Sequence, residues 1–169
     1  IQLNDHRANA QWHGNFTASQ GYLLGLLVGD GTLKSDAAVL SVWAGSSKAD
    51  DAGDGTISSG VKAIMRKAEQ AVRGQKHRSD FAGWSKVAGR GEYRLKCVAL
   101  RDLAFEVGMR PGNKPITPAI ECGSSEFCRS FLRGFYDADG SVQGSQIKGV
   151  SVRLAQSDIA RLEAVQRML

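Results

Sequence analysis

Two aspartates that each precede a glycine at the end of an apolar segment are the residues of this sequence best suited to chemistry. Asp30 stands near the end of LLGLLVGDG, and Asp139 near the end of LRGFYDADG. If each segment is a helix, the aspartate lies at the negative end of the helix dipole, which disfavours its charge by about 0.3 kcal/mol or more. Two carboxylates brought together also repel each other. Divalent cations would remove both penalties, and oxygen ligands of this kind suit Mg²⁺. We therefore predict a magnesium site at these two residues.

Small residues recur at every fourth position in both segments. Because residues four apart lie on one face of a helix, we expect the two helices to pack backbone against backbone along these faces. Glycine within a helix costs up to about 1 kcal/mol relative to alanine, so two matching sets indicate that close approach is needed. This packing would bring Asp30 beside Asp139. The predicted interface residues are Gly21, Gly25 and Gly29 in the first helix and Ser130, Gly134 and Ala138 in the second.

The elements around the two aspartates are predicted to follow the same order. In the first part we expect a helix over 17–29 that starts with a T-A-S-Q capping box, a hairpin over 32–43 with its turn at Ser35 and Asp36, a helix over 58–72, strands over 81–88 and 92–99, and a helix over 100–107. In the second part we expect a helix over 126–140, a hairpin over 141–156 and a helix over 157–169 capped by Ser157. The chain is thus divided into a leader or linker (1–16), a first unit (17–109), a connector (110–123) and a second unit (124–169). By this internal comparison the second unit lacks a last hairpin and helix, so we expect a fragment or a chain completed by another segment.

The composition favours a soluble protein whose charge is compatible with binding a polyanion. Lysine and arginine total 22 against 17 acidic residues, and the resulting charge of +5 is compatible with nucleic acid without requiring it. Three cysteines without a CxxC pair argue against a disulfide framework or a zinc ribbon. The longest uncharged apolar run has 9 residues, far fewer than the roughly 20 of a membrane-spanning helix. We therefore expect no membrane segment and a cytoplasmic location.

The segments Leu23–Gly31 and Leu132–Gly140 resemble the two copies of the nine-residue motif of the LAGLIDADG homing endonucleases. The resemblance covers nearly the whole chain from Gln20 onward, and the stretches GYLLGLLVGDGTL and VRLAQSDIARLEAVQRML are similar to endonuclease domains carried inside bacterial inteins. It implies an α+β fold of pseudo-twofold αββαββα repeats, the second incomplete here. It also implies an enzyme, monomeric when complete, that cleaves double-stranded DNA in the bacterial cytoplasm, with an intein splicing domain in the same parent chain.

The resemblance also implies roles for particular residues. Asp30 and Asp139 would be catalytic and would bind Mg²⁺ or another divalent cation, each serving one DNA strand. Gln156 would orient solvent at the metal site, and Lys96 is a candidate for a basic residue that contacts catalytic solvent. Asp137 is given no catalytic role. The strands would form a saddle over the DNA major groove, with contacts from Lys86, Arg90, Arg94, Lys96, Lys148 and Arg153.

Two alternatives remain open. A catalytically degenerate LAGLIDADG module, of the maturase or regulator type, would bind nucleic acid without cutting it. The presence of both motif aspartates argues against this module, whereas the imperfect match at the supporting positions argues for it. The chain could also matter as part of a protein-splicing intein. It begins with Ile1 and ends with Leu169, so this segment alone is not expected to splice.

Overall fold

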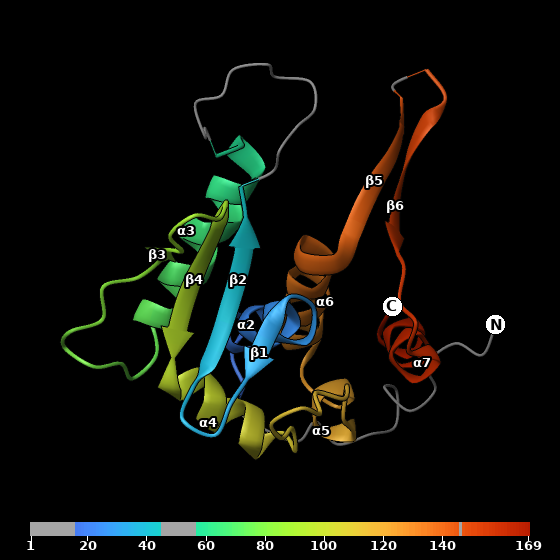
Figure 1. Cartoon of the computed structure of the whole chain (residues 1–169). Coiled ribbons are helices and arrows are strands. Elements are labelled where there is room, and N and C mark those ends of the chain that lie inside the picture. The colour runs from blue at the N-terminus through green and yellow to red at the C-terminus, as the bar shows by residue number, and fades with distance from the viewer. Residues whose placement is uncertain (1–15, 45–56, 146) are drawn as a thin grey trace.

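Helices and antiparallel sheets make up the computed structural model, which confirms the predicted α+β class and describes residues 16–44, 57–145 and 147–169. Residues 1–15 of the predicted leader and residues 45–56 of the loop after the first hairpin lie outside the described residues. The predicted order of elements is confirmed, with one short additional helix, α5, in the connector. The elements are α2 (Ala18–Val28), β1 (Gly31–Leu33), β2 (Ala38–Trp43), α3 (Ser59–Arg73), β3 (Ser85–Lys86), β4 (Glu92–Cys97), α4 (Val98–Glu106), α5 (Pro118–Glu121), α6 (Ser125–Asp139), β5 (Gly140–Ser145), β6 (Gly149–Leu154) and α7 (Ile159–Met168) (Figure 1).

Local capping sets the helix ends. Thr17 and Gln20 form the predicted capping box at the start of α2. At α7 the predicted cap, Ser157, is wrong: the cap is Asp158, whose carboxylate accepts a hydrogen bond from an N–H of the first turn. Aspartate caps a helix as well as serine does, so the helix begins one residue later. The next helix boundary that differs is that of α4, which begins at Val98, before the predicted range.

The strand predicted over 81–88 is mostly wrong, because only β3 within it pairs with β4. Gly83 has a φ of +81°, which interrupts the extended backbone. The next residue, Trp84, turns towards α3, where its Nε1–H donates to the carbonyl oxygen of Met65 at 2.9 Å. The indole therefore ties this segment to a helix rather than to the sheet.

The strands of the first unit form one antiparallel sheet in the order β1-β2-β4-β3. Gly31 pairs with Leu40, so the start of β1 lies beside the middle of β2. Leu40 and Leu95 pair across β2 and β4, and both side chains are buried in the core with the apolar residues of α2. The sheet thus rests on the helix that carries the first motif.

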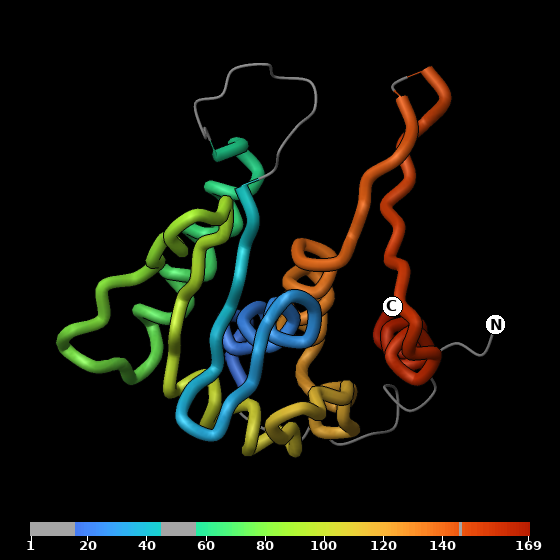
Figure 2. Tube along the Cα trace, viewed as in Figure 1, coloured from blue at the N-terminus to red at the C-terminus, as the bar shows by residue number. Residues whose placement is uncertain are grey.

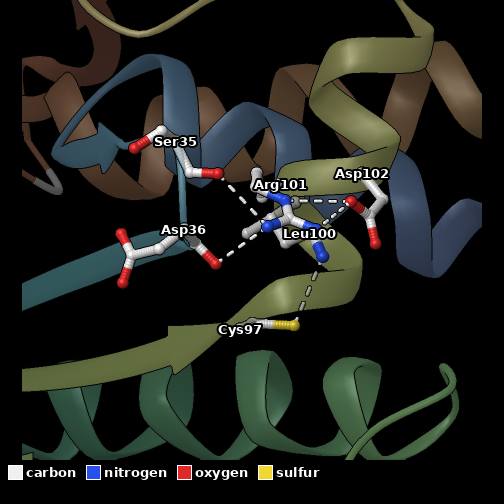
Figure 3. A network of polar contacts seen from close by, with 6 residues as sticks. All are labelled: Ser35, Asp36, Cys97, Leu100, Arg101 and Asp102. Atoms are coloured by element: carbon white, nitrogen blue, oxygen red, sulfur yellow. Dashed lines mark hydrogen bonds and ion pairs between the residues drawn. The ribbon is translucent and has the colours of Figure 1, made fainter.

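Arg101 of α4 holds the turn between β1 and β2 (Figure 3). Its Nη1 donates to the carbonyl oxygens of Ser35 at 3.2 Å and Asp36 at 3.0 Å. Asp102 accepts from Nε of the same guanidinium at 2.9 Å. The turn lies where the sequence predicts it, and the helix after β4 fixes its position.

Helices α2 and α6 pack at the centre of the molecule with their backbones in contact. A Cβ added to Gly25 would lie 2.1 Å from the carbonyl oxygen of Phe131, and one added to Gly134 would lie 2.2 Å from that of Tyr22. Tyr22 and Phe131 hold equivalent positions in the two motif segments. The contact is therefore two-fold symmetric, and only glycine allows it at these two positions.

The second hairpin, β5 and β6, forms a separate two-stranded ribbon that extends from the end of α6 (Figures 1 and 2). The pair Val142↔Val152 in the ribbon corresponds to Leu33↔Ala38 in the first sheet, because each lies two residues beyond the first pair of its hairpin. Leu33 and Ala38 are 4% and 0% exposed, whereas Val142 and Val152 are 70% and 62% exposed. Within residues 16–44, 57–145 and 147–169 the ribbon has no counterpart of β4 and α4, which lie against the first hairpin.

Candidate active site

The C-terminal ends of α2 and α6 bring the two motif aspartates together. A Cβ added to Gly29 would lie 2.4 Å from Cβ of Ala138 and 3.3 Å from Cγ of Asp139. The carboxyl group of Asp139 thus lies against the residue that precedes Asp30. Partial burial, and after it the charge of Asp139, raise the pKa of Asp30 above its usual value. Two acidic side chains, one just after α2 and one at the end of α6, therefore share one site and repel each other there.

Lys114, which the sequence analysis missed, supplies the positive charge at this site. Its Nζ donates to the carbonyl oxygens of Leu27 at 2.6 Å, Val28 at 3.3 Å and Gly31 at 2.5 Å, at the negative end of α2. Burial, and after it the charge of Arg161, lower the pKa of Lys114 to about 8, while the two motif aspartates oppose this shift. Lys114 stands in a connector without helical or strand periodicity, so no local pattern pointed to it.

Replacing Lys114 with methionine is expected to lower the free energy of unfolding by about 2 kcal/mol, because carbonyl groups at the end of α2 lose their donor. The effect is also expected to depend on pH. The pKa is about 8 in the folded protein against an ordinary 10.5, so the unfolded chain binds more protons between these values. The unsubstituted protein therefore gains stability over the variant as pH rises through this window. Urea unfolding at several pH values measures both effects.

Lys96→Met is the matched control, because this lysine is exposed and its ion pair with Asp36 is open to solvent. Exposed ion pairs contribute little to stability, so a much smaller loss of unfolding free energy is expected from this variant. Equal losses of unfolding free energy in Lys114→Met and Lys96→Met would contradict the placement of Lys114 at the end of α2.

Gln156 is hydrogen-bonded to one of the two aspartates. Its Nε2–H donates to Oδ2 of Asp139. Gln156 follows β6, two residues after Leu154, and Leu154 corresponds to Leu40 in the register of the first hairpin. The place of Gln156 is therefore taken by Val42 in the first unit, which cannot make this bond. The surroundings of the two aspartates differ accordingly.

Arg94 and Lys96 lie on the same solvent-facing side of β4, as their alternation predicts. Each has an acidic partner: Arg94 donates to the carboxylate of Glu92 at 2.6 and 3.1 Å, and Nζ of Lys96 lies 2.8 Å from Oδ2 of Asp36. Because β2 lies between β4 and β1, Lys96 is set apart from the start of β1. The structure places Lys96 at the hairpin turn and not beside the motif aspartates.

The other predicted DNA contacts lie at exposed positions on the two hairpins. Lys86 is in β3, and Arg90 is in the turn before β4, with its Nη1 3.9 Å from Oε2 of Glu92. Lys148 is in the turn of the ribbon, and Arg153 is in β6. All four side chains are open to solvent, spread over both units.

A divalent cation at this site would need ligands besides the two carboxylates. Within residues 16–44, 57–145 and 147–169, no group of three or more His, Cys, Asp and Glu side chains is arranged to hold a metal. Magnesium sites commonly combine one or two carboxylates with water and phosphate oxygens, so the pair fits that chemistry. Across the same described residues, every helix is too short or too polar to cross a lipid bilayer.

Comparison with known proteins gives a family match for one part of the chain. Residues 126–169 match the family described as LAGLIDADG-like domain. This part comprises most of α6 together with β5, β6 and α7, and it includes Asp139 and Gln156. No curated protein matches the chain.

Solved structures of the homing endonuclease I-DmoI are similar to the chain at low identity. A structure of mesophilic I-DmoI variants has a TM-score of 0.48 and 16% identity, over 89% of this chain and 74% of that one. A structure of I-DmoI with DNA and Mn has a TM-score of 0.47 and 16% identity, over 89% of this chain and 75% of that one.

Proposed function

We propose that this chain is the endonuclease part of an intein and cleaves double-stranded DNA at a specific site with the help of divalent cations. The observation that carries the proposal is the pairing of Asp30 and Asp139 at the adjoining ends of α2 and α6. An acidic pair whose members repel each other is unfavourable unless a cation binds there. The match of residues 126–169 to the LAGLIDADG-like domain supports the same conclusion for the second half.

Asp30 and Asp139 would hold Mg²⁺ or another divalent cation between or beside their carboxylates. When bound, such a cation polarises a phosphodiester oxygen and makes water a stronger nucleophile. Gln156 would keep the carboxylate of Asp139 in one orientation. Lys114 would hold the end of α2 in place and balance part of the negative charge before DNA arrives.

The exposed basic side chains would bind the DNA backbone and base edges. A two-stranded ribbon such as β5–β6 has the width to enter a major groove, and Arg153 lies on it. Arg94 and Lys96 would exchange their partners Glu92 and Asp36 for phosphates. Because phosphate contacts release counterions, binding would weaken steeply as salt is raised.

The proposal is tested with a plasmid library that carries a randomised insert, incubated with the protein in Mg²⁺, in Mn²⁺ or in EDTA. Linear products with defined ends, formed only with divalent cations, are the expected result, and sequencing of those ends gives the target. Binding in a mobility-shift assay without cleavage would favour the degenerate nucleic-acid-binding module. If the protein neither binds nor cleaves DNA, both the endonuclease and the binding-module functions are overturned.

Gln156→Ala is expected to slow cleavage of one strand more than the other. Gln156 touches Asp139, whereas Val42 at the equivalent place makes no such contact with Asp30. Removing a partner that orients a metal ligand typically costs about 10–100-fold, so nicked plasmid should accumulate before linear plasmid appears. Strand-specific end labelling measures the two rates. Equal slowing of both strands would contradict the assignment.

The origin and state of the protein follow from the same proposal. The stretches similar to intein endonuclease domains indicate that a splicing domain belongs to the same parent chain. With two motif helices in one chain, the complete protein would act as a monomer, since each helix already has its partner. Its place of action would be the bacterial cytoplasm, on nucleoid DNA.

A further inference from the structure

The α2–α6 interface is symmetric in its backbone contacts but not in one pair of side chains. Oη–H of Tyr22 donates to Oδ2 of Asp137 at 2.8 Å across the interface. The two-fold counterpart of Tyr22 is Phe131, and that of Asp137 is Val28. Phe131 and Val28 are both fully buried. One side of the interface therefore carries a polar pair where the other side has two apolar residues.

Within this polar pair the tyrosine is buried, whereas the side chain of Asp137 is 29% exposed. Tyr22 is 1% exposed, and Nζ of Lys67 lies 4.3 Å from the centre of its ring. Nε of Arg133 lies 3.9 Å from Oδ2 of Asp137, so a cation also faces the carboxylate. A hydroxyl this deeply buried would lose a hydrogen bond without regaining one from water if Asp137 were absent.

We propose that the Tyr22–Asp137 hydrogen bond makes α2 select α6 and prevents either helix from pairing with its own counterpart in a second copy of this chain. In an α2–α2 interface each Tyr22 hydroxyl would face Val28, and in an α6–α6 interface each Asp137 would face Phe131. The buried Tyr22 hydroxyl would have no acceptor in the first pairing, and Asp137 would lose the hydrogen bond it accepts from Tyr22 in the second, so both pairings are penalised.

The backbone contacts do not make this choice, because Gly25 and Gly134 approach equivalent residues on either side. The small residues allow close packing of any two of these helices. The hydrogen bond then discriminates among the possible pairings, independently of nuclease activity.

Trapping of the wrong pairing tests the proposal in the full chain. A Cβ on Gly29 would lie 2.4 Å from Cβ of Ala138, so position 138 is at the symmetry axis. In an Ala138→Cys background the new thiol faces Gly29 in the native pairing but a second thiol in an α6–α6 pairing. The chain is refolded at rising concentration with oxidised glutathione, and disulfide-linked dimers are measured on non-reducing gels. The same variants without Ala138→Cys give the contribution of the native cysteines.

Adding Tyr22→Phe with Asp137→Val makes both sides of the interface apolar. The dimer fraction is expected to rise about fivefold or more over Ala138→Cys alone, because the native pairing then no longer gains a hydrogen bond that the α6–α6 pairing lacks. Tyr136→Phe is the matched control, since it removes a tyrosine hydroxyl from α6 next to Asp137 and should leave the dimer fraction unchanged. An equal dimer fraction in all three would overturn the proposal.

A second variant separates selection from loss of stability. Val28→Asp with Phe131→Tyr places the polar pair on both sides, so every pairing is satisfied and dimers should again increase. A rise with the apolar pair but not with the doubled polar pair would overturn the proposal. If the doubled variant does not refold, Tyr22→Phe alone in the Ala138→Cys background decides: the native pairing then lacks the same hydrogen bond as the wrong one, so an increase in dimers supports the proposal and an unchanged dimer fraction refutes it.

Discussion

Asp30→Asn is expected to abolish double-strand cleavage while the protein stays folded. Asparagine has the shape of aspartate but lacks the charge that a divalent cation needs at the end of α2. Such a cation contributes several kcal/mol to the stabilisation of a phosphodiester transition state. A loss of about 3 kcal/mol corresponds to roughly a hundredfold in rate, so cleavage should fall by at least this factor. Plasmid linearisation under single-turnover conditions measures the loss.

The stability of Asp30→Asn should equal or exceed that of the unsubstituted protein at neutral pH. The pKa of Asp30 is raised in the folded protein, so the folded state binds more protons than the unfolded chain once pH passes the ordinary value of 3.8. The carboxylate therefore removes stability as pH rises through this window, and asparagine does not. Asp80→Asn is the control: Asp80 is exposed and paired with Arg78, and its loss should leave cleavage unchanged. Normal cleavage by Asp30→Asn would contradict the proposed function.

Gly25→Ala is expected to have the largest effect on stability, although it adds a single methyl group. That methyl would lie 2.1 Å from the carbonyl oxygen of Phe131 and 2.7 Å from the backbone nitrogen of Phe135. Both atoms belong to the backbone of α6, so the helices must move apart. Overpacking of a core typically costs about 1–3 kcal/mol, and a rigid backbone on the opposite side places this variant at 3 kcal/mol or more. Urea unfolding followed by circular dichroism gives the change.

Gly60→Ala provides the matched control in a helix that is not at the interface. A Cβ on Gly60 meets nothing within 4 Å, and Gly60 lies in the first turn of α3. Alanine is the better helix former by up to about 1 kcal/mol, so this variant should be slightly more stable than the parent. The two glycine-to-alanine substitutions should therefore change the free energy of unfolding in opposite directions. A stable Gly25→Ala variant would show that the α2–α6 interface is looser than described.

The parts of the fold that depend on nearby residues could be predicted from the sequence. The capping box at Thr17, the turn at Ser35 and the four-residue spacing of the glycines each depend on neighbours within one turn of the chain. The duplication of the motif then located Asp30 and Asp139, because two matching helix ends are more informative than one. The candidate site and the helices that carry it could thus be predicted from local patterns, without any knowledge of contacts between distant residues.

The supporting residues depend on contacts between distant segments, and these could not be predicted in the same way. Lys114 reaches Leu27 across 87 positions of sequence, from a connector that carries no periodic pattern. Lys96 was the predicted basic residue at the site because of its place late in the first unit, yet it pairs with Asp36. The observed strand is shorter than the one predicted over 81–88, because the indole N–H of Trp84 donates a hydrogen bond to a carbonyl group on α3. These contacts join residues that are far apart in the sequence, so no local pattern indicates them.

The contrast between α2 and the β5–β6 ribbon has a consequence for how the molecule would adapt to a partner. Every residue of α2 from Gly21 to Val28 is buried, so this helix opens only when the whole core opens. The ribbon has exposed valines on the side that the first hairpin buries, so in the part of the chain that the structure describes few contacts outside the ribbon hold its shape. Bending the ribbon therefore costs little, while moving α2 against α6 costs much. The ribbon, which is proposed to enter the DNA major groove, can therefore change shape easily, whereas the adjoining ends of α2 and α6, which are proposed to cut the DNA, are rigid.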